Sequence, residues 1–171
     1  MSKMMSKLDL RMETIDGEHC FMVFEVDGSC RRVWFDGDYP PLSLLQEAVD
    51  GYIEPVDYYF LNPDTQQPYE GLEGVSFLVN EEGLIRNMPV NLMKRYGTQG
   101  AECPEGENPM FWGWQPLCGP IVAYIPEENG RGGLTYRQKF LLEDLFSKLE
   151  TESETWRLRC LDSLGLKEDA Q

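Results

Sequence analysis

The sequence has little of what metal centres and catalytic triads require. It contains one histidine, His19, and five cysteines, none of which stands in a Cys-x-x-Cys pair. Zinc sites are built from Cys and His ligands at short paired spacings. A Ser-His-Asp triad would have to use His19, and no Gly-x-Ser-x-Gly nucleophile motif is present. We therefore expect no metal and no cofactor, and we assign no catalytic residue.

Basic side chains are also scarce. Lys and Arg number 15 against 30 Asp and Glu, which gives a formal net charge of −15. Residues 41–125 hold 12 acidic and 3 basic side chains, so most of the excess lies there. Nucleic-acid affinity depends on Lys and Arg that neutralise phosphates, and anionic lipid attracts the same residues. Direct nucleic-acid binding and membrane docking are disfavoured. A basic protein partner fits this charge, although a solvated surface that maintains solubility is the simplest explanation.

Long apolar runs are missing too. No run of about 18 apolar residues is present, so no transmembrane helix is expected. Lys3 and Lys7 are not followed by the apolar segment of a secretory signal. With an odd number of unpaired cysteines, these observations predict a cytoplasmic protein with reduced thiols. The length favours one α+β domain over residues 1–133, followed by an amphipathic helix over 134–165.

The first part of the chain contains Asp-Gly pairs that are typical of tight turns. Asp16-Gly17 and Asp27-Gly28 each separate apolar residues that alternate with period two. Asp-Gly is the preferred pair of a two-residue hairpin turn, because both positions need positive φ. A turn centred on Asp27-Gly28 places Met22 opposite Val33. The pattern predicts an antiparallel meander of three strands, at 7–15, 18–26 and 29–36.

The central part alternates apolar segments with turn residues. Leucines after Pro41 predict a short helix over 42–49, ended by a left-handed residue at Gly51. Asn91 is expected to cap a second short helix. The remaining expected elements are strands at 52–61, 75–79, 84–85 and 121–125 and the second helix at 91–96.

The last part predicts a long helix. Thr135 and Gln138 have the spacing of a capping box, and leucines recur behind them at helical intervals. Either one helix of nearly thirty residues or two helices meeting near Thr151 would fit, and Gly165 would end the last one. The expected fold class is α+β: a mostly antiparallel sheet of five to seven strands, with one short helix and a long C-terminal helix packed on one side.

Five short motifs occur in a characteristic order. They are Leu44-Leu45-Gln46, Asp50-Gly51-Tyr52-Ile53-Glu54, Val79-Asn80-Glu81-Glu82-Gly83, Met88-Pro89-Val90-Asn91 and Gly119-Pro120-Ile121-Val122. In this order the chain resembles the domain-of-unknown-function family 3846 over roughly residues 31–125. The first thirty residues, the segment 97–118 and the C-terminal helix fall outside the resemblance. The resemblance implies no activity. Members known from phages, other mobile elements and bacteria imply a small cytoplasmic accessory protein.

Aromatic residues around position 112 form the candidate ligand site. Stacking on Trp112, Trp114 and Tyr96 would suit a planar, nucleotide-like ligand. Arg86 and Arg95, two of the three basic residues between 41 and 125, would then contact its phosphates. The simpler interpretation is an aromatic core that closes over a sheet edge.

A second apolar stripe on the C-terminal helix forms the candidate partner site. It comprises Trp156, Leu158, Leu161 and Leu164. Such a stripe is difficult to bury within one small domain, so it is expected to dock on another chain. Burial against the sheet is the alternative.

Three function hypotheses follow. The leading one is a non-enzymatic accessory protein that acts by protein–protein interaction, through an acidic surface and the C-terminal helix. The alternative is a small-ligand protein that binds or sequesters a nucleotide-like molecule. A carboxylate-based hydrolase using Glu54, Glu81 and Glu82 is the second alternative, because such chemistry needs paired carboxylates. The simpler interpretation of Glu81 and Glu82 is a solvated turn.

Overall fold

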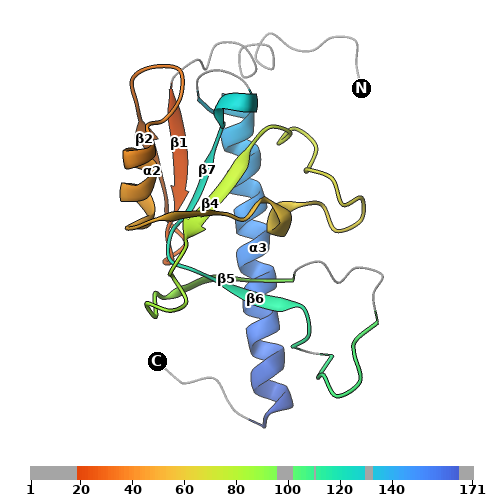
Figure 1. Ribbon diagram of the computed structural model, residues 1–171. Coiled ribbons are helices and arrows are strands. Elements are labelled where there is room, and N and C mark those ends of the chain that lie inside the picture. Colours follow the sequence, from red (N-terminus) through yellow and green to blue (C-terminus); the bar gives the residue numbers. More distant parts are fainter. Residues whose placement is uncertain (1–18, 96–101, 110, 130–132, 166–171) are drawn as a thin grey trace, which may run out of the picture.

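The computed structural model describes residues 19–95, 102–109, 111–129 and 133–165. Figure 1 shows an α+β fold, as the sequence predicted. The elements in chain order are β1 (Cys20–Phe24), β2 (Cys30–Trp34), α2 (Leu42–Val49), β3 (Ile53–Pro55), the 3-10 helix η1 (Asp57–Phe60), β4 (Ser76–Asn80), β5 (Val90–Arg95), β6 (Trp114–Cys118), β7 (Ile121–Tyr124), the 3-10 helix η2 (Glu127–Asn129) and α3 (Tyr136–Ser163).

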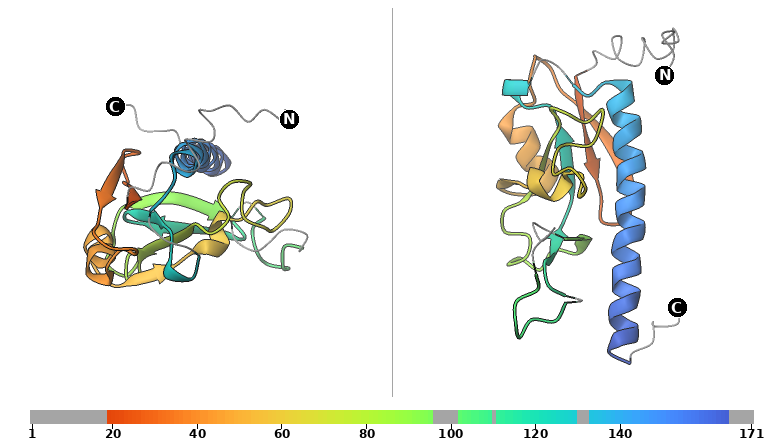
Figure 2. Two further views of the ribbon diagram at one scale, coloured as in Figure 1. Left: turned by 90° about the horizontal axis from the view of Figure 1, so that it is seen from above. Right: turned by 90° about the vertical axis from the view of Figure 1, so that its right-hand side faces the viewer.

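Five strands form an antiparallel sheet in the order β2-β1-β7-β4-β3. All five residues of β1 are buried. An antiparallel sheet often leaves one face in water, and its strands then alternate apolar and polar residues. Here α3 covers one face and α2 covers the other (Figure 2). The centre of the sheet is therefore apolar on both sides.

Alternate residues of the strands supply two separate apolar clusters. Met22 and Phe24 point to α3, where Phe146 stacks on Phe24 with the ring centroids 3.7 Å apart. Phe21 and Val23 point the other way, into the cluster that contains α2. Burial of one such side chain contributes about 1.5–3 kcal/mol. The two helices thus stabilise the sheet from opposite faces, and not from one side as the sequence suggested, because β1 presents apolar side chains to both faces.

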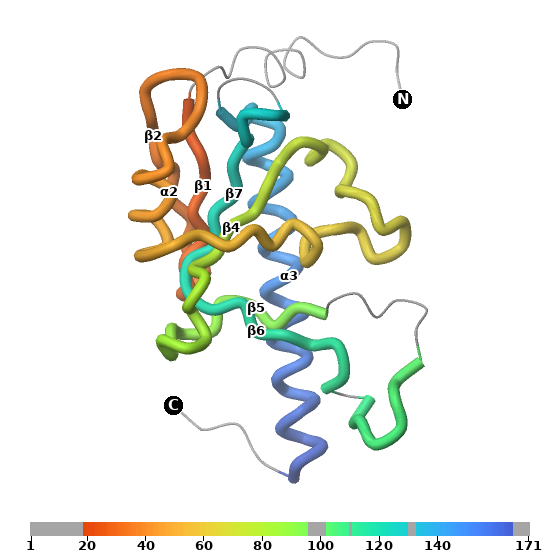
Figure 3. The backbone as a smooth tube through the Cα atoms, in the orientation of Figure 1, coloured from red at the N-terminus to blue at the C-terminus, as the bar shows by residue number. Residues whose placement is uncertain are grey.

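A second, two-stranded sheet is formed by β5 and β6. It lies against the distal half of α3, away from α2 (Figure 3). The prediction of a helix over 91–96 is wrong, because these positions up to Arg95 belong to the strand β5. In β5 the buried residues Leu92 and Lys94 are two apart, which is strand periodicity. Asn91 is no helix cap: its amide donates to the carbonyl oxygens of Phe24 (2.8 Å) and Gly119 (3.0 Å).

The first hairpin differs from its prediction by one residue. Phe21, not Met22, lies opposite Val33. The loop has three residues, because the Glu25 amide donates to the Ser29 carbonyl (2.8 Å) and Gly28 takes a φ of 87°. A slip of one residue exchanges the two faces of a strand, so the loop length decides which side chains reach α3.

The three-strand meander was also wrong in its pairing. β1 lies between β2 and β7, and Met22–Phe24 pair with Ile121–Ala123. No edge of β1 is left there for a strand at 7–15, and residues 7–15 themselves lie outside the described part of the chain.

Some other elements begin or end at different residues from those predicted from the sequence. The left-handed residue after α2 is Asp50 (φ 58°), not Gly51. The strand expected over 52–61 is the short β3 followed by η1, and 84–85 belong to a turn. The strands predicted at 75–79 and 121–125 are confirmed as β4 and β7.

The long C-terminal helix is confirmed as one continuous element. α3 has 28 residues and begins with the predicted capping box, in which the Thr135 side chain accepts from the Gln138 amide (3.1 Å). The Gln138 side chain accepts in return from the Thr135 amide (2.9 Å). Gly165 follows the helix with a φ of 72°.

Asn80 locks the end of α2 to the end of β4. The side chain is 3% exposed, and its amide donates to the carbonyl oxygens of Val49 (2.9 Å) and Asp50 (3.0 Å). Its carbonyl oxygen accepts from the Glu82 amide (2.7 Å). A Cβ atom at Gly51 would lie 2.7 Å from the Asn80 amide nitrogen. Residues from two of the sequence motifs, Asp50–Glu54 and Val79–Gly83, thus meet in one structural junction.

Replacing Asn80→Ala should lower the free energy of unfolding by about 1–3 kcal/mol, because buried carbonyl groups would lose their donor. Urea denaturation followed by circular dichroism measures this as a lower midpoint at unchanged slope. Glu81→Ala, an exposed change in the same turn, serves as the control and should leave the midpoint unaltered. Equal midpoints for the two variants would contradict the role of Asn80.

Candidate functional site

The distal half of α3 and the β5–β6 hairpin share an aromatic cluster. Trp156 of α3 stacks on Trp114 of β6, with ring centroids 5.4 Å apart. Phe111 meets Trp156 edge-to-face at 6.0 Å. One residue of the predicted ligand site and one of the predicted partner site therefore contact each other. One face of the Trp114 ring is therefore covered by Trp156.

The same helix half covers the outer edge of β5. The Ser153 hydroxyl accepts a hydrogen bond from the Met93 amide (2.9 Å). An exposed strand edge is a template for unwanted pairing, and a covering helix prevents this. The distal half of α3 is thus attached to the second sheet by backbone as well as by aromatic contacts.

Lys94 is buried between these elements. It is 7% exposed and makes no hydrogen bond or ion pair with any residue of the described part. Loss of hydration lowers the pKa of its ammonium group, while the charge of Glu152 on α3 acts in the opposite direction. Lys94 is therefore a cation that the fold holds at a cost, and it is not exposed to bind phosphate.

The predicted ligand residues are only partly brought together. Arg86 lies at the end of α2, where its guanidinium donates to the Asp50 carbonyl (2.6 Å) and carboxylate (3.1 Å). Arg95 pairs with Trp114 in the β5–β6 ladder, and Trp112 is half-buried just before β6. Tyr96 lies outside the described residues. Arg86 is thus engaged at the α2–β4 junction and is not part of an aromatic ligand site.

The predicted partner stripe divides into two parts. Trp156 and Leu161 are half-buried. Leu158 and Leu164 are 41% and 61% exposed. Part of the stripe therefore packs within the chain, while two leucines remain at the surface, and docking of the stripe on another chain stays a prediction.

The carboxylates considered for catalysis lie on solvated elements. Glu54 is on the edge strand β3, opposite Val79. Glu81 and Glu82 are exposed in the turn after β4. His19 stacks on Phe35 with a centroid distance of 5.7 Å. Within the described ranges no three His, Cys, Asp or Glu side chains are grouped to hold a metal ion.

Three of the five cysteines have thiols whose pKa is raised above its ordinary value. Loss of hydration, followed by the charge of Glu143, raises the pKa of Cys30 to about 11. Burial also raises the pKa of Cys118 and of Cys160. A thiol must ionise to act as a nucleophile, so these three are protonated and unreactive near neutral pH.

A groove of about 530 Å³ lies beside the aromatic cluster, and the sequence analysis did not anticipate it. It is bounded by the β1–β2 loop, by β5 and by α3. Three apolar residues, Phe24, Leu92 and Phe146, and three carboxylates, Glu25, Glu150 and Glu154, are among its lining residues. Its volume is within the range of ligand-binding sites. The three segments are far apart in the sequence, so no local motif could have revealed the groove.

No helix of the described residues is both long enough and apolar enough to cross a membrane.

The family model described as Domain of unknown function (DUF3846) matches residues 19–147. The match is wider than the 31–125 expected from the motifs, and it includes β1, β2 and the first twelve residues of α3. No curated protein and no solved structure matches the chain.

The aromatic cluster predicts a measurable coupling. Trp156→Ala should lower the free energy of unfolding by about 1–3 kcal/mol, because it leaves Trp114 and Phe111 without their partner. In a double-mutant cycle with Trp114→Ala, the coupling energy should be about 0.5–1.5 kcal/mol. Urea denaturation measures both values. Leu164→Ala, at an exposed position, should stay within about 0.5 kcal/mol of wild type, and a zero coupling energy would contradict the packing.

The buried Lys94 predicts a pH-dependent stability difference. Its folded-state pKa lies below the ordinary 10.5, so at pH 7 only the unfolded state keeps the ammonium group fully hydrated. Lys94→Met should therefore raise the urea midpoint at pH 7. The gain should shrink as the pH rises from the lowered folded-state pKa toward 10.5, because the folded protein loses its proton first. Lys148→Met, at an exposed position, should show neither effect, and a gain independent of pH would contradict the explanation.

Proposed function

We propose that this chain, which belongs to the family described as Domain of unknown function (DUF3846), is a non-enzymatic accessory protein that acts by binding another protein. The family description carries no activity, so the proposal is drawn from the surface of this molecule. The observation that carries the proposal is the distal half of α3. That part of the helix presents apolar side chains to solvent although its other face is already packed.

Leu158 and Leu164 are the exposed members of this surface, 41% and 61% accessible. The helix continues past the β5–β6 hairpin, so its last turns extend beyond the body of the molecule (Figure 2). Apolar side chains on a projecting helix are a common means of docking into a groove on a partner. Trp156 and Cys160, packed on the inner face, hold the helix in place for such contact.

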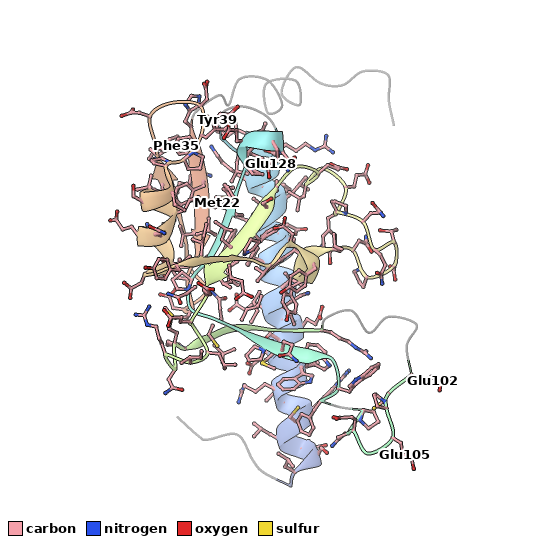
Figure 4. The ribbon with its side chains drawn as sticks, in the orientation of Figure 1. Met22, Phe35, Tyr39, Glu102, Glu105 and Glu128 are labelled. Atoms are coloured by element: carbon pink, nitrogen blue, oxygen red, sulfur yellow. The ribbon has the colours of Figure 1, made fainter. Side chains whose placement is uncertain are left out.

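The acidic charge supports a basic partner. Of the three basic residues between 41 and 125, Lys94 is buried and Arg86 is engaged by Asp50. Glu128 lies at one end of the molecule and Glu102 and Glu105 lie at the other (Figure 4), so negative charge is spread over its length. Such a field accelerates encounter with a positively charged protein.

The alternatives have less support. A nucleotide-like ligand would need phosphate contacts near an open aromatic face. Arg86 instead binds Asp50 at the end of α2, and Trp156 stacks on one face of the Trp114 ring. A hydrolase would need paired carboxylates shielded from water, whereas Glu81 and Glu82 are exposed in a turn. We further propose a cytoplasmic role connected with phages or other mobile elements, the setting that the family resemblance implies.

The test is native mass spectrometry of the protein purified gently from its own cell. A second polypeptide should accompany the wild-type chain. The pair Leu158→Glu and Leu164→Glu should lose it, because two carboxylates would enter the apolar contact. The pair Leu84→Glu and Ile85→Glu is the matched control, with the same charge change at side chains 66% and 81% exposed in the turn after β4.

Retention of the partner by the control and its loss from the α3 variant would support the proposal, provided both variants keep the wild-type unfolding midpoint. A bare chain in the wild-type spectrum, or equal retention by both variants, would contradict it.

A further inference from the structure

We propose that the groove between the β1–β2 loop, β5 and α3 binds an extended segment of a partner protein in which a Lys or Arg side chain stands next to an apolar one. This inference rests on the proposed function and specifies the chemistry of the partner. It follows from the apolar lining, the charge of the walls and the preformed backbone of the site.

The apolar lining comes from both sheets and the helix. Phe24 and Phe146 are stacked with an interplanar angle of 5° and belong to the main core. Leu92 of β5 belongs to the same core. All three side chains also line the groove. Their packing on the core side fixes their position, so this lining exists before any ligand arrives and suits an aliphatic side chain.

The walls carry more negative than positive charge. Glu25 is paired with Arg31 (2.9 Å) and Glu154 with Arg157 (2.6 Å). Glu150 lines the same groove and has no ion pair with any described residue. It lies beside the β1–β2 loop, where a Cβ atom at Gly28 would be 3.1 Å from its carboxylate oxygen. Glu150 is therefore an available acceptor for a cation at the rim of the groove.

The same charges decide between occupants. The net negative charge of the walls repels the phosphates of a nucleotide, and Arg157, the basic residue of the lining, already has a carboxylate partner. A second copy of this chain carries a formal net charge of −15 itself, so its approach to the acidic walls is opposed by long-range repulsion. A segment with a basic side chain gains attraction from Glu150 and places its neighbouring apolar side chain over Phe24 and Leu92.

The backbone around the groove is already hydrogen-bonded. Ser153 accepts from the Met93 amide, and the Asn91 side chain donates to two carbonyl groups. Met93 therefore offers no free amide to an added strand. Recognition here is by side chains in a preformed site, which limits the entropy lost on binding.

Three synthetic peptides test the proposal with the full-length protein: acetyl-Arg-Leu-Lys-Leu-Arg-amide, its acidic counterpart with Glu at the three charged positions, and acetyl-Arg-Gly-Lys-Gly-Arg-amide. Binding is measured by ¹H–¹⁵N chemical-shift titration. The first peptide should shift the amides of Glu150, Ser153 and Arg157, and added salt should weaken its binding. The acidic peptide should not bind, and the glycine peptide should bind about tenfold or more weakly, since it lacks the apolar contacts.

Two matched variants locate the site. Glu150→Gln should weaken binding of the first peptide about 3- to 10-fold, because it removes one charge at the rim and keeps the shape. Glu81→Gln removes the same charge from the turn after β4 and should leave the Kd within about twofold. Equal effects of the two variants, or equal affinity for the glycine peptide, would show a diffuse attraction to the acidic surface and overturn the proposal.

Other results separate this inference from the proposed function. A partner that stays bound to the Glu150→Gln variant with wild-type affinity but leaves the Leu158→Glu and Leu164→Glu variant would overturn the groove alone. A wild-type chain without a partner would count against the proposed function, while the peptide titration would still decide the groove. Self-association in analytical ultracentrifugation that shifts the same groove amides would overturn it in favour of a second copy.

Discussion

Phe146 lies where the long helix, the five-stranded sheet and the groove meet. Its ring stacks on Phe24 and lies 5.4 Å from the ring of Phe60. Because the ring is 6% exposed and surrounded by aromatic neighbours, it fixes how α3 crosses the sheet. That crossing carries the following two turns of the helix over β5. The position of Glu150, Ser153 and Trp156 relative to the second sheet therefore depends on packing at Phe146.

One helix consequently has two different tasks. Its first half supplies buried leucines to the main core, and its second half covers a hairpin that is too small to bury it completely. A two-stranded sheet is marginally stable alone, so β5 and β6 depend on Trp156 and Ser153 as much as the helix depends on them. The incomplete coverage leaves Leu158 and Leu164 in solvent and leaves the groove open between β5 and the first hairpin.

Local signals in the sequence predicted the elements whose residues satisfy one another locally. The capping box of Thr135 and Gln138, and the leucines behind it, placed α3 correctly because its start and its stripe are properties of neighbouring residues. The prediction of a helix at β5 was wrong because the Asn91 side chain donates hydrogen bonds to the carbonyl groups of Phe24 and Gly119, residues far away in the chain. The predicted register of the first hairpin was wrong by one residue because Val26, Asp27 and Gly28 together form a three-residue loop.

The candidate site was predictable only in fragments. Trp114 and Trp156 were each singled out, but for two different sites, and their stacking requires the fold of the β5–β6 hairpin. Arg86 was assigned to phosphate from the scarcity of bases around it, whereas Asp50 accepts its hydrogen bonds across the end of α2. The groove had no sequence signature, since its parts are joined by tertiary packing alone.

The family match includes the apolar residues of the groove but only part of its acidic wall. Asn80 and Gly51, which belong to the motifs that carry the resemblance, are used internally to hold α2 against β4. The matched residues end at 147, so they include Phe24, Leu92 and Phe146 at the groove but stop before Glu150. Two of the three groove carboxylates, Glu150 and Glu154, and the exposed leucines therefore lie outside the matched residues, whereas Glu25 lies within them. Binding at the groove depends on Glu150, which the family match does not reach, and it is therefore proposed for this chain alone.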